Sequence, residues 1–174
     1  MIERWTDQGS RQGAARWLKA IGTDDLLFDS ERILAYWRST RDPRAAKLLA
    51  YKAEPALVRD ILPELVRDAG EGWIVSRAAI RAAPLSNDLW DAISEAFPAT
   101  YLYLCATLAR PVQDTEALAL VRRTPGWPGD QRGLALWAVR EMGLLAALDE
   151  VRTSLEELRM QDRAAMGLRD VSDS

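Results

Sequence analysis

Apolar residues recur every three or four positions along nearly the whole chain, which is the spacing that gathers them on one face of an α-helix. Runs that alternate apolar and polar residues and are rich in Val, Ile and Thr, as β-strands would be, are nearly absent. The pattern therefore predicts an all-α protein of about eight to nine helices.

The N-terminal part, residues 1–42, is expected to form a helical hairpin. Its first helix covers residues 10–20 and ends at a glycine, which most readily closes a helix in the left-handed conformation. The second helix begins after residues 23–25, whose side chains can cap its free amides, or restarts part-way at residues 29–30. We expect it to stop just before Pro43.

Three later segments that end in proline resemble one another: RAAKLLAYKAEP ends at Pro55, WIVSRAAIRAAP at Pro84 and TYLYLCATLARP at Pro111. The prolines stand 29 and 27 residues apart. Alanines fall five and two positions before each proline, namely Ala50, Ala53, Ala79, Ala82, Ala106 and Ala109. A fourth copy, GLALWAVREMGL, keeps small residues and has Leu144 in place of the proline.

These segments predict a repeated unit of helix, turn and helix over residues 43–160, because each is followed by a second apolar stretch. Alanines three residues apart let a neighbouring helix approach closely, and proline is tolerated at the start of a helix. Chance is the alternative, since an alanine-rich helical chain produces such matches without repetition. With a polar, frayed tail at 161–174, we expect one domain over residues 1–174.

A proline and a pair of arginines within the repeats lead to further predictions. Pro63 lies inside an expected helix and should kink it or end it early. Arg77 and Arg81 stand four residues apart in the second copy, where we expect them to decorate a solvated face.

Paired helices with a proline at the turn and small residues on the first helix resemble the HEAT and armadillo-like α-solenoids. The resemblance covers residues 44–158, with a period shorter than the roughly 40 residues usual for those repeats. It implies a right-handed stack of antiparallel helical hairpins, a HEAT-like α-solenoid, that recognises a protein along a curved surface.

Composition removes several classes of function. The 174 residues carry 23 basic and 26 acidic side chains, so nothing favours a nucleic-acid partner. There is no histidine, Cys105 is the single cysteine, and nucleotide and zinc motifs are absent, so we expect no cofactor, no metal and no catalytic residue. No leader or membrane-spanning stretch is evident, which favours a cytoplasmic protein without a membrane partner.

Cysteine, tyrosine and tryptophan side chains are candidates for a functional role. Cys105 lies in an apolar helix and is expected to be a buried structural thiol. Tyr101 and Tyr103, two residues apart, point to different faces, so one should meet solvent. Most of the seven tryptophans occupy helical positions, where core packing is expected, but Trp127 lies in the turn TPGWPGDQRG. There it either plugs a seam between hairpins, which we favour, or anchors a partner.

The carboxylates of Asp88, Asp91 and Glu95 lie on one helix face near Asn87, a spacing that allows a general acid and base. Residues 86–88 already serve as the cap and first turn of that helix, which favours a structural interpretation. We therefore predict a partner-binding surface rather than an active site. Its candidate residues are Asn87, Asp88, Asp91, Glu95, Arg122, Arg123 and Trp127.

The sequence favours a non-enzymatic protein–protein interaction module: an adaptor, a scaffold subunit, or an inhibitor such as a bacterial immunity protein. The alternative is an enzyme similar to the HEAT-like DNA glycosylases, which use an aromatic-lined cleft and an acidic residue. No basic stripe of the kind that DNA requires is evident. Self-association through the N-terminal hairpin, which carries Trp5, is a further expectation.

Overall fold

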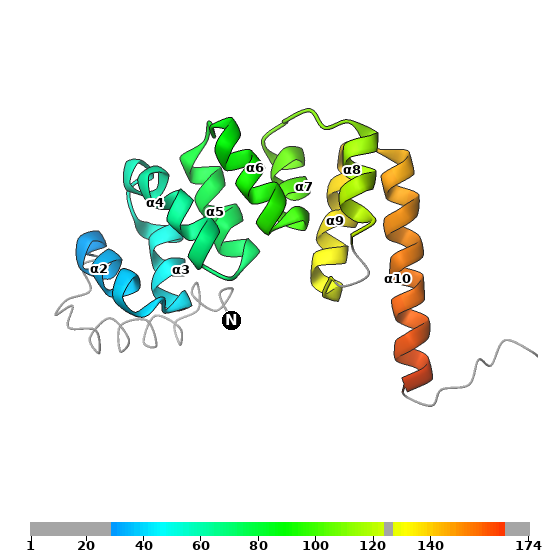
Figure 1. Ribbon diagram of the computed structural model, residues 1–174, viewed down its shortest axis with the longest axis horizontal. Helices are drawn as coiled ribbons and strands as arrows, with labels where there is room; N and C mark the ends of the chain where they lie inside the picture. The colour runs from blue at the N-terminus through cyan, green and yellow to red at the C-terminus, as the bar shows by residue number, and fades with distance from the viewer. Residues whose placement is uncertain (1–28, 124–126, 166–174) are drawn as a thin grey trace, which may run out of the picture. The chain divides into compact units, whose positions relative to one another are not determined.

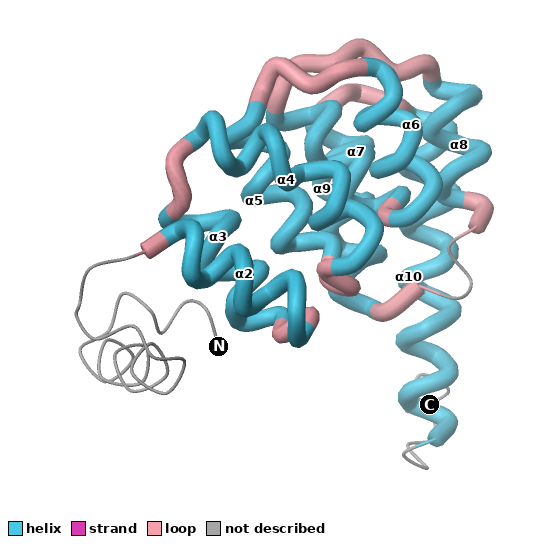
Figure 2. Tube along the Cα trace, turned by 60° about the vertical axis from the view of Figure 1, so that its left-hand side comes forward, coloured by secondary structure: helices cyan, strands magenta, loops and turns pink. Residues whose placement is uncertain are grey.

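The structure is a computed structural model that describes residues 29–123 and 127–165. Over these residues the chain forms nine α-helices, α2 to α10, and no strand (Figures 1 and 2). The all-α prediction is confirmed for this part of the chain. The helix expected over residues 10–20, and Trp5, lie outside the described residues. Helix contacts form two compact units, and the chain passes from unit 1 to unit 2 between Ala83 and Pro84.

Unit 1 contains α2 (Ser30–Thr40), α3 (Pro43–Lys52), α4 (Pro55–Asp68) and α5 (Gly72–Ala82). Helix α2 packs against α3, and both α3 and α4 pack against α5. The large side chains that fill this core are almost inaccessible to solvent, and they are Ile33, Trp37, Leu49, Ile61, Leu62, Leu65 and Ile74.

The starts of α2 and α3 follow from short polar side chains. The Asp29 carboxylate accepts hydrogen bonds from the amides of Glu31 and Arg32, both at 3.1 Å. The Asp42 carboxylate accepts one from the amide of Arg44 at 2.9 Å. Such caps satisfy amides that have no partner inside the helix. The predicted restart at residues 29–30 is therefore confirmed, as is the end of this helix before Pro43.

Helix α4 does not end at Pro63, so this part of the prediction is wrong. The helix continues to Asp68. Proline has no amide to donate to the carbonyl of Arg59, but both residues are exposed, so water can take that hydrogen bond. Leu62 and Leu65 meanwhile stay fully buried on the other side, and this packing holds the helix together.

Arginines close two helix ends in unit 1. The Arg81 guanidinium donates hydrogen bonds to the carbonyls of Ala50, at 2.9 Å, and Ala53, at the end of α3. Arg59 donates to the carbonyl of Ala82 at 3.1 Å, at the end of α5. Burial and the nearby Arg77 lower the pKa of Arg81. The expected solvated position is therefore wrong for Arg81, because its side chain satisfies carbonyls that lack partners within their own helix.

Unit 2 contains α6 (Asn87–Ala96), α7 (Pro98–Thr107), α8 (Asp114–Val121), α9 (Gly129–Glu141) and α10 (Leu145–Ala165). Helix α7 packs against α6, α8 and α9, and α10 packs against α8 and α9. Buried side chains of its core include Ile93, Leu102, Leu104, Val121, Ala135, Ala138, Val139, Ala147 and Val151. Among the described helices of both units, none is long and apolar enough to cross a membrane.

The alanines of the predicted repeat behave alike in two copies only. Those of the first two copies, Ala50, Ala53, Ala79 and Ala82, are completely buried. In the third copy α7 ends at Thr107, and Ala109 is exposed with a φ of 53°. Of the three marker prolines, only Pro55 begins a helix. The repeat and the single domain therefore stay predictions.

Candidate functional site

The predicted acidic surface lies on the exposed side of α6. Ser86 caps this helix, as expected, by accepting a hydrogen bond from the amide of Leu89 at 3.4 Å. Asn87, Asp88, Asp91 and Glu95 are all exposed. Since no described residue forms an ion pair with these carboxylates, the side chains are available to a partner.

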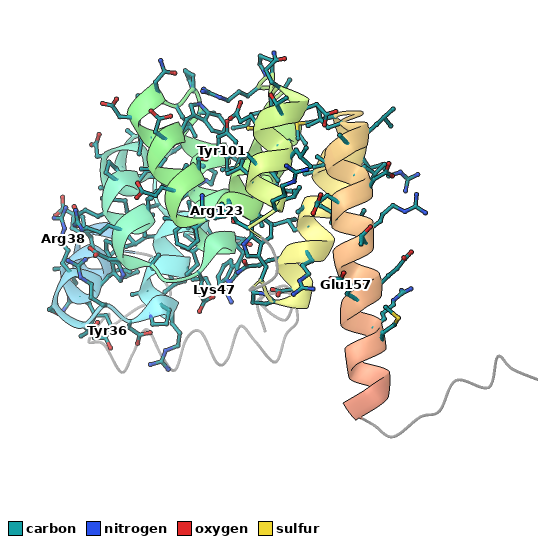
Figure 3. All side chains as sticks on the ribbon, turned by 45° about the vertical axis from the view of Figure 1, so that its right-hand side comes forward. Tyr36, Arg38, Lys47, Tyr101, Arg123 and Glu157 are labelled. Atoms are coloured by element: carbon teal, nitrogen blue, oxygen red, sulfur yellow. The ribbon has the colours of Figure 1, made fainter. Side chains whose placement is uncertain are left out.

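The predicted arginines stand at the end of α8. Arg122 forms a 3.5 Å ion pair with Glu150 of α10, and both side chains are largely exposed. Arg123 is also exposed (Figure 3). Within the described part of the chain, neither arginine pairs with a carboxylate of α6. The structure thus brings Arg122 to α10 and does not join the predicted residues into one cluster by direct contact.

Trp127, the turn tryptophan, is half-buried. Its carbonyl accepts a hydrogen bond from Nε of Arg132 at 2.9 Å, and Arg132 is only 7% exposed. This bond ties the turn to the first part of α9. The choice between a plug and an anchor at Trp127 stays a prediction.

An aromatic cluster joins α6, α7 and α8. The rings of Trp90 and Tyr101 meet edge to face, with centroids 5.8 Å apart, and the Arg110 guanidinium carbon lies 4.7 Å from the centre of the Trp90 ring. The Tyr101 hydroxyl donates a 2.6 Å hydrogen bond to Glu116. Burial, and then this bond, raise the pKa of Tyr101. The Tyr101 hydroxyl is bonded to Glu116 and the Arg110 guanidinium lies over the Trp90 ring, so we assign this cluster a packing role.

Cys105 and the tyrosines of α7 match their predictions. Cys105 is completely buried, and burial raises the pKa of its thiol to about 11. A thiol in that state is a poor nucleophile near neutral pH. Tyr101 is 4% exposed, while Tyr103 is the more accessible of the two tyrosines.

In unit 1, two cationic side chains stack on two aromatic rings between α3 and α5. We call this group the ladder, and its members are Lys47, Tyr51, Trp73 and Arg77. Lys47 Nζ lies 4.9 Å from the centre of the Trp73 ring, and the Arg77 guanidinium carbon lies 4.9 Å from that of Tyr51 (Lys47 in Figure 3). The two rings are 6.3 Å apart. Burial lowers the pKa of Lys47. The ladder alternates cations with ring faces across the seam between two packed helices, which is a stabilising arrangement.

Helices α9 and α10 pack against each other (Figure 1), and together they carry a groove with an exposed tryptophan. Trp137 is 45% exposed, and its ring rests against Tyr103, with centroids 5.4 Å apart. It borders an open groove of about 450 Å³. The lining residues come from α9 and α10, and they are Gly133, Leu136, Trp137, Arg140, Leu148 and Arg152. Core packing, the expected role of most tryptophans, does not apply to Trp137.

The geometry of α9 explains why this tryptophan faces outward. Buried positions on α9 are occupied by the small residues Ala135 and Ala138, together with Val139. At about 100° per residue, Trp137 lies roughly 150° around the helix from the centre of the face that these three form. Helix α9 therefore buries its small side chains among its neighbours α7 and α10, while Trp137 lies at the edge of this packing, against Tyr103 of α7 and partly exposed.

Helix α10, the second wall of the groove, is held in place by a residue of α8. Leu144 stands just before α10 and its carbonyl accepts the first helical hydrogen bond, from Leu148, but its side chain cannot cap. The Asp114 carboxylate instead accepts hydrogen bonds from the amides of Ala146 and Ala147, both at 3.3 Å. Asp114 thus supplies the cap that the local sequence lacks.

Comparison with known protein families, with curated protein sequences and with solved structures gives no significant match. The candidate function is therefore argued from this geometry. Within the described residues, no three His, Cys, Asp or Glu side chains gather as metal ligands would.

Proposed function

We propose that this protein is a non-enzymatic protein–protein interaction module that holds its partner on unit 2. The observation that carries the proposal is Trp137, which is 45% exposed, braced by Tyr103 and placed at an open groove. Tryptophan, tyrosine and arginine supply most of the binding energy at protein interfaces, and a rigidly held ring loses little entropy on binding. An adaptor, a scaffold subunit and an inhibitor all fit this description.

We further propose that the helical hairpins belong to a HEAT-like α-solenoid. Supporting this are the buried alanine pairs of α3 and α5 and the packing of these alternate helices on each other. In unit 2, α7 likewise packs on α9 and α8 on α10. Helix stacks of this kind present extended surfaces for protein recognition.

Affinity capture from cells that produce the protein tests the function. The full chain should retain one protein at a constant molar ratio, and Trp137→Ala should lose it. The double variant Asp88→Lys, Asp91→Lys serves as the second arm, because it alters the other predicted surface while leaving α9 and α10 intact. Circular dichroism checks that both variants keep the helical content of the parent chain.

Each outcome has a distinct meaning. If only Trp137→Ala loses the captured protein, the result supports binding at α9 and α10. If only the double variant of α6 loses it, the interface lies on the predicted acidic surface. Capture of no protein contradicts the interaction module. Binding to duplex DNA that weakens steeply with salt would instead favour the glycosylase-like alternative.

A further inference from the structure

The groove on α9 and α10 has features that define what it can bind. Its α9 wall is built by positions 133, 136, 137 and 140, which follow the spacing i, i+3, i+4, i+7. This spacing forms one continuous strip of two helical turns, roughly 10 Å long at 1.5 Å per residue. The α10 wall adds Leu148 and Arg152, four residues apart on that helix. The groove therefore has the length that two turns of another helix would cover.

Gly133 leaves a gap at one end of the groove. Apart from the two adjacent residues and the backbone of its own helix, a Cβ atom added at this position would meet no atom within 4 Å, so the space beside α9 is open there. A glycine on a helix surface lets a second backbone approach closely. Since Leu136, Trp137 and Leu148 line the remainder, the apolar part of the groove matches the apolar stripe of an amphipathic helix.

The charged residues that line the groove are all positive. Its two charged residues are Arg140 and Arg152, both exposed and neither paired with a carboxylate among the described residues. Arg140 stands one residue before the end of α9 and Arg152 seven after the start of α10, so they lie roughly 9 Å apart along the hairpin. Guanidinium groups at such positions bind carboxylates by paired hydrogen bonds.

We propose that this groove binds an acidic amphipathic helix of the partner protein, an inference that rests on the interaction module proposed above. The partner helix places large apolar side chains against Leu136, Trp137 and Leu148. It carries Asp or Glu about two turns apart, one for Arg140 and one for Arg152. Charge complementarity thus orients the helix, while the apolar contacts provide its affinity.

A library of random 16-residue peptides displayed on phage provides the probe. It is selected on the full chain and counter-selected on Gly133→Leu, a change that places a leucine side chain in the groove from a position where an added Cβ meets open space. We expect enriched peptides to combine two or three large apolar residues at helical spacing with acidic residues about seven positions apart. Their synthetic versions should gain helicity on binding.

Charge reversal separates the proposed site from a general electrostatic effect. Arg140→Glu and Arg152→Glu should each weaken binding of the selected peptide by roughly tenfold or more. Arg32→Glu is the matched control, because Arg32 is an exposed arginine of unit 1 that does not line the groove, and it should change binding less than about threefold. Gly133→Leu should abolish binding while its unfolding transition remains at least as stable as that of the parent.

Other results would overturn the inference. Enrichment of basic or uncharged peptides, equal binding to Gly133→Leu, or no enrichment at all would each contradict an acidic helix in this groove. Dimerisation of the chain that Gly133→Leu abolishes would assign the groove to a second copy. If affinity capture still yields a partner in any of these cases, the interaction module stands and only the class of ligand is wrong.

Discussion

The cap that Asp114 provides to α10 leads to a quantitative prediction, because the residue acts on a helix that begins 31 positions later in the chain. The local residue Leu144 has no side-chain oxygen, so Asp114→Ala leaves the amides of Ala146 and Ala147 without their acceptor. Removing a helix cap costs about 0.5–2 kcal/mol of folding free energy. Both hydrogen bonds measure 3.3 Å, longer than the usual range, which favours a loss of about 1 kcal/mol.

Asp114→Asn separates the contribution of the hydrogen bonds from that of the negative charge at the start of α10. Asparagine keeps an oxygen that can accept a hydrogen bond but removes the charge, which contributes about 0.3–1 kcal/mol at a helix N-terminus. We therefore expect Asp114→Asn to lose about half as much stability as Asp114→Ala. The loss of stability caused by Asp114→Asn should shrink in 1 M salt, where charges are screened over about 3 Å, whereas the difference between the two uncharged variants should stay the same.

Urea unfolding followed by far-UV circular dichroism provides the measurement. Asp91→Ala is the control, since Asp91 is an exposed carboxylate in the middle of α6 that forms no ion pair with any residue the structure describes. Its removal should change the unfolding free energy by less than about 0.5 kcal/mol. If Asp114→Ala costs no more than Asp91→Ala, the cap does not hold α10 in place, and the reasoning is refuted.

Three further outcomes are expected. Ala109→Gly should stabilise the protein by about 0.5–1 kcal/mol, because the φ of 53° strains alanine. Ala119→Gly, at an exposed position within α8, should destabilise it by a similar amount, and urea denaturation of both variants measures the two effects. Cys105 should react with a thiol reagent at pH 8 only on unfolding, and rapid labelling of the native protein would contradict its burial. Hydrogen bonds from Arg38 lower the pKa of Glu64, so its stabilising effect is present above about pH 4.3 and lost as the pH falls through the lowered value. Glu64→Gln should therefore reduce the loss of stability in acid, and an unchanged pH profile would count against it.

Local features of the fold were predictable from the sequence. Asp29 and Ser86 begin their helices because a short polar side chain can reach amides two or three residues ahead. The apolar surroundings of Cys105 in the sequence likewise predict its burial, since α7 is apolar on most sides. These inferences require only neighbours within one or two helical turns.

Contacts between distant segments were not predictable in this way. Arg81 bonds to carbonyls 31 and 28 residues earlier, and Asp114 bonds to amides 32 and 33 residues later. No sequence spacing indicates which helix end will lie beside them. The predicted partner surface on α6 also omitted the groove of α9 and α10.

The outward position of Trp137 did leave a signal in the sequence. Small residues were expected where helices approach closely, and Ala135 and Ala138 mark such a face on α9. A tryptophan on another face of this helix must then lie at the edge of that contact, where part of its ring stays exposed. The expectation that most helical tryptophans lie in the core does not identify this exception, because hydrophobicity alone does not decide which face of a helix is buried.

The affinity of the captured partner for the full chain and for Gly133→Leu tests the central claim most directly. Titration calorimetry should give one partner per chain for the parent and a dissociation constant at least about tenfold higher for Gly133→Leu, with no loss of stability in the variant. Since the new side chain enters open space in the groove, such a result would locate the interface on α9 and α10. Equal affinity for the two proteins would show that the partner does not use this groove.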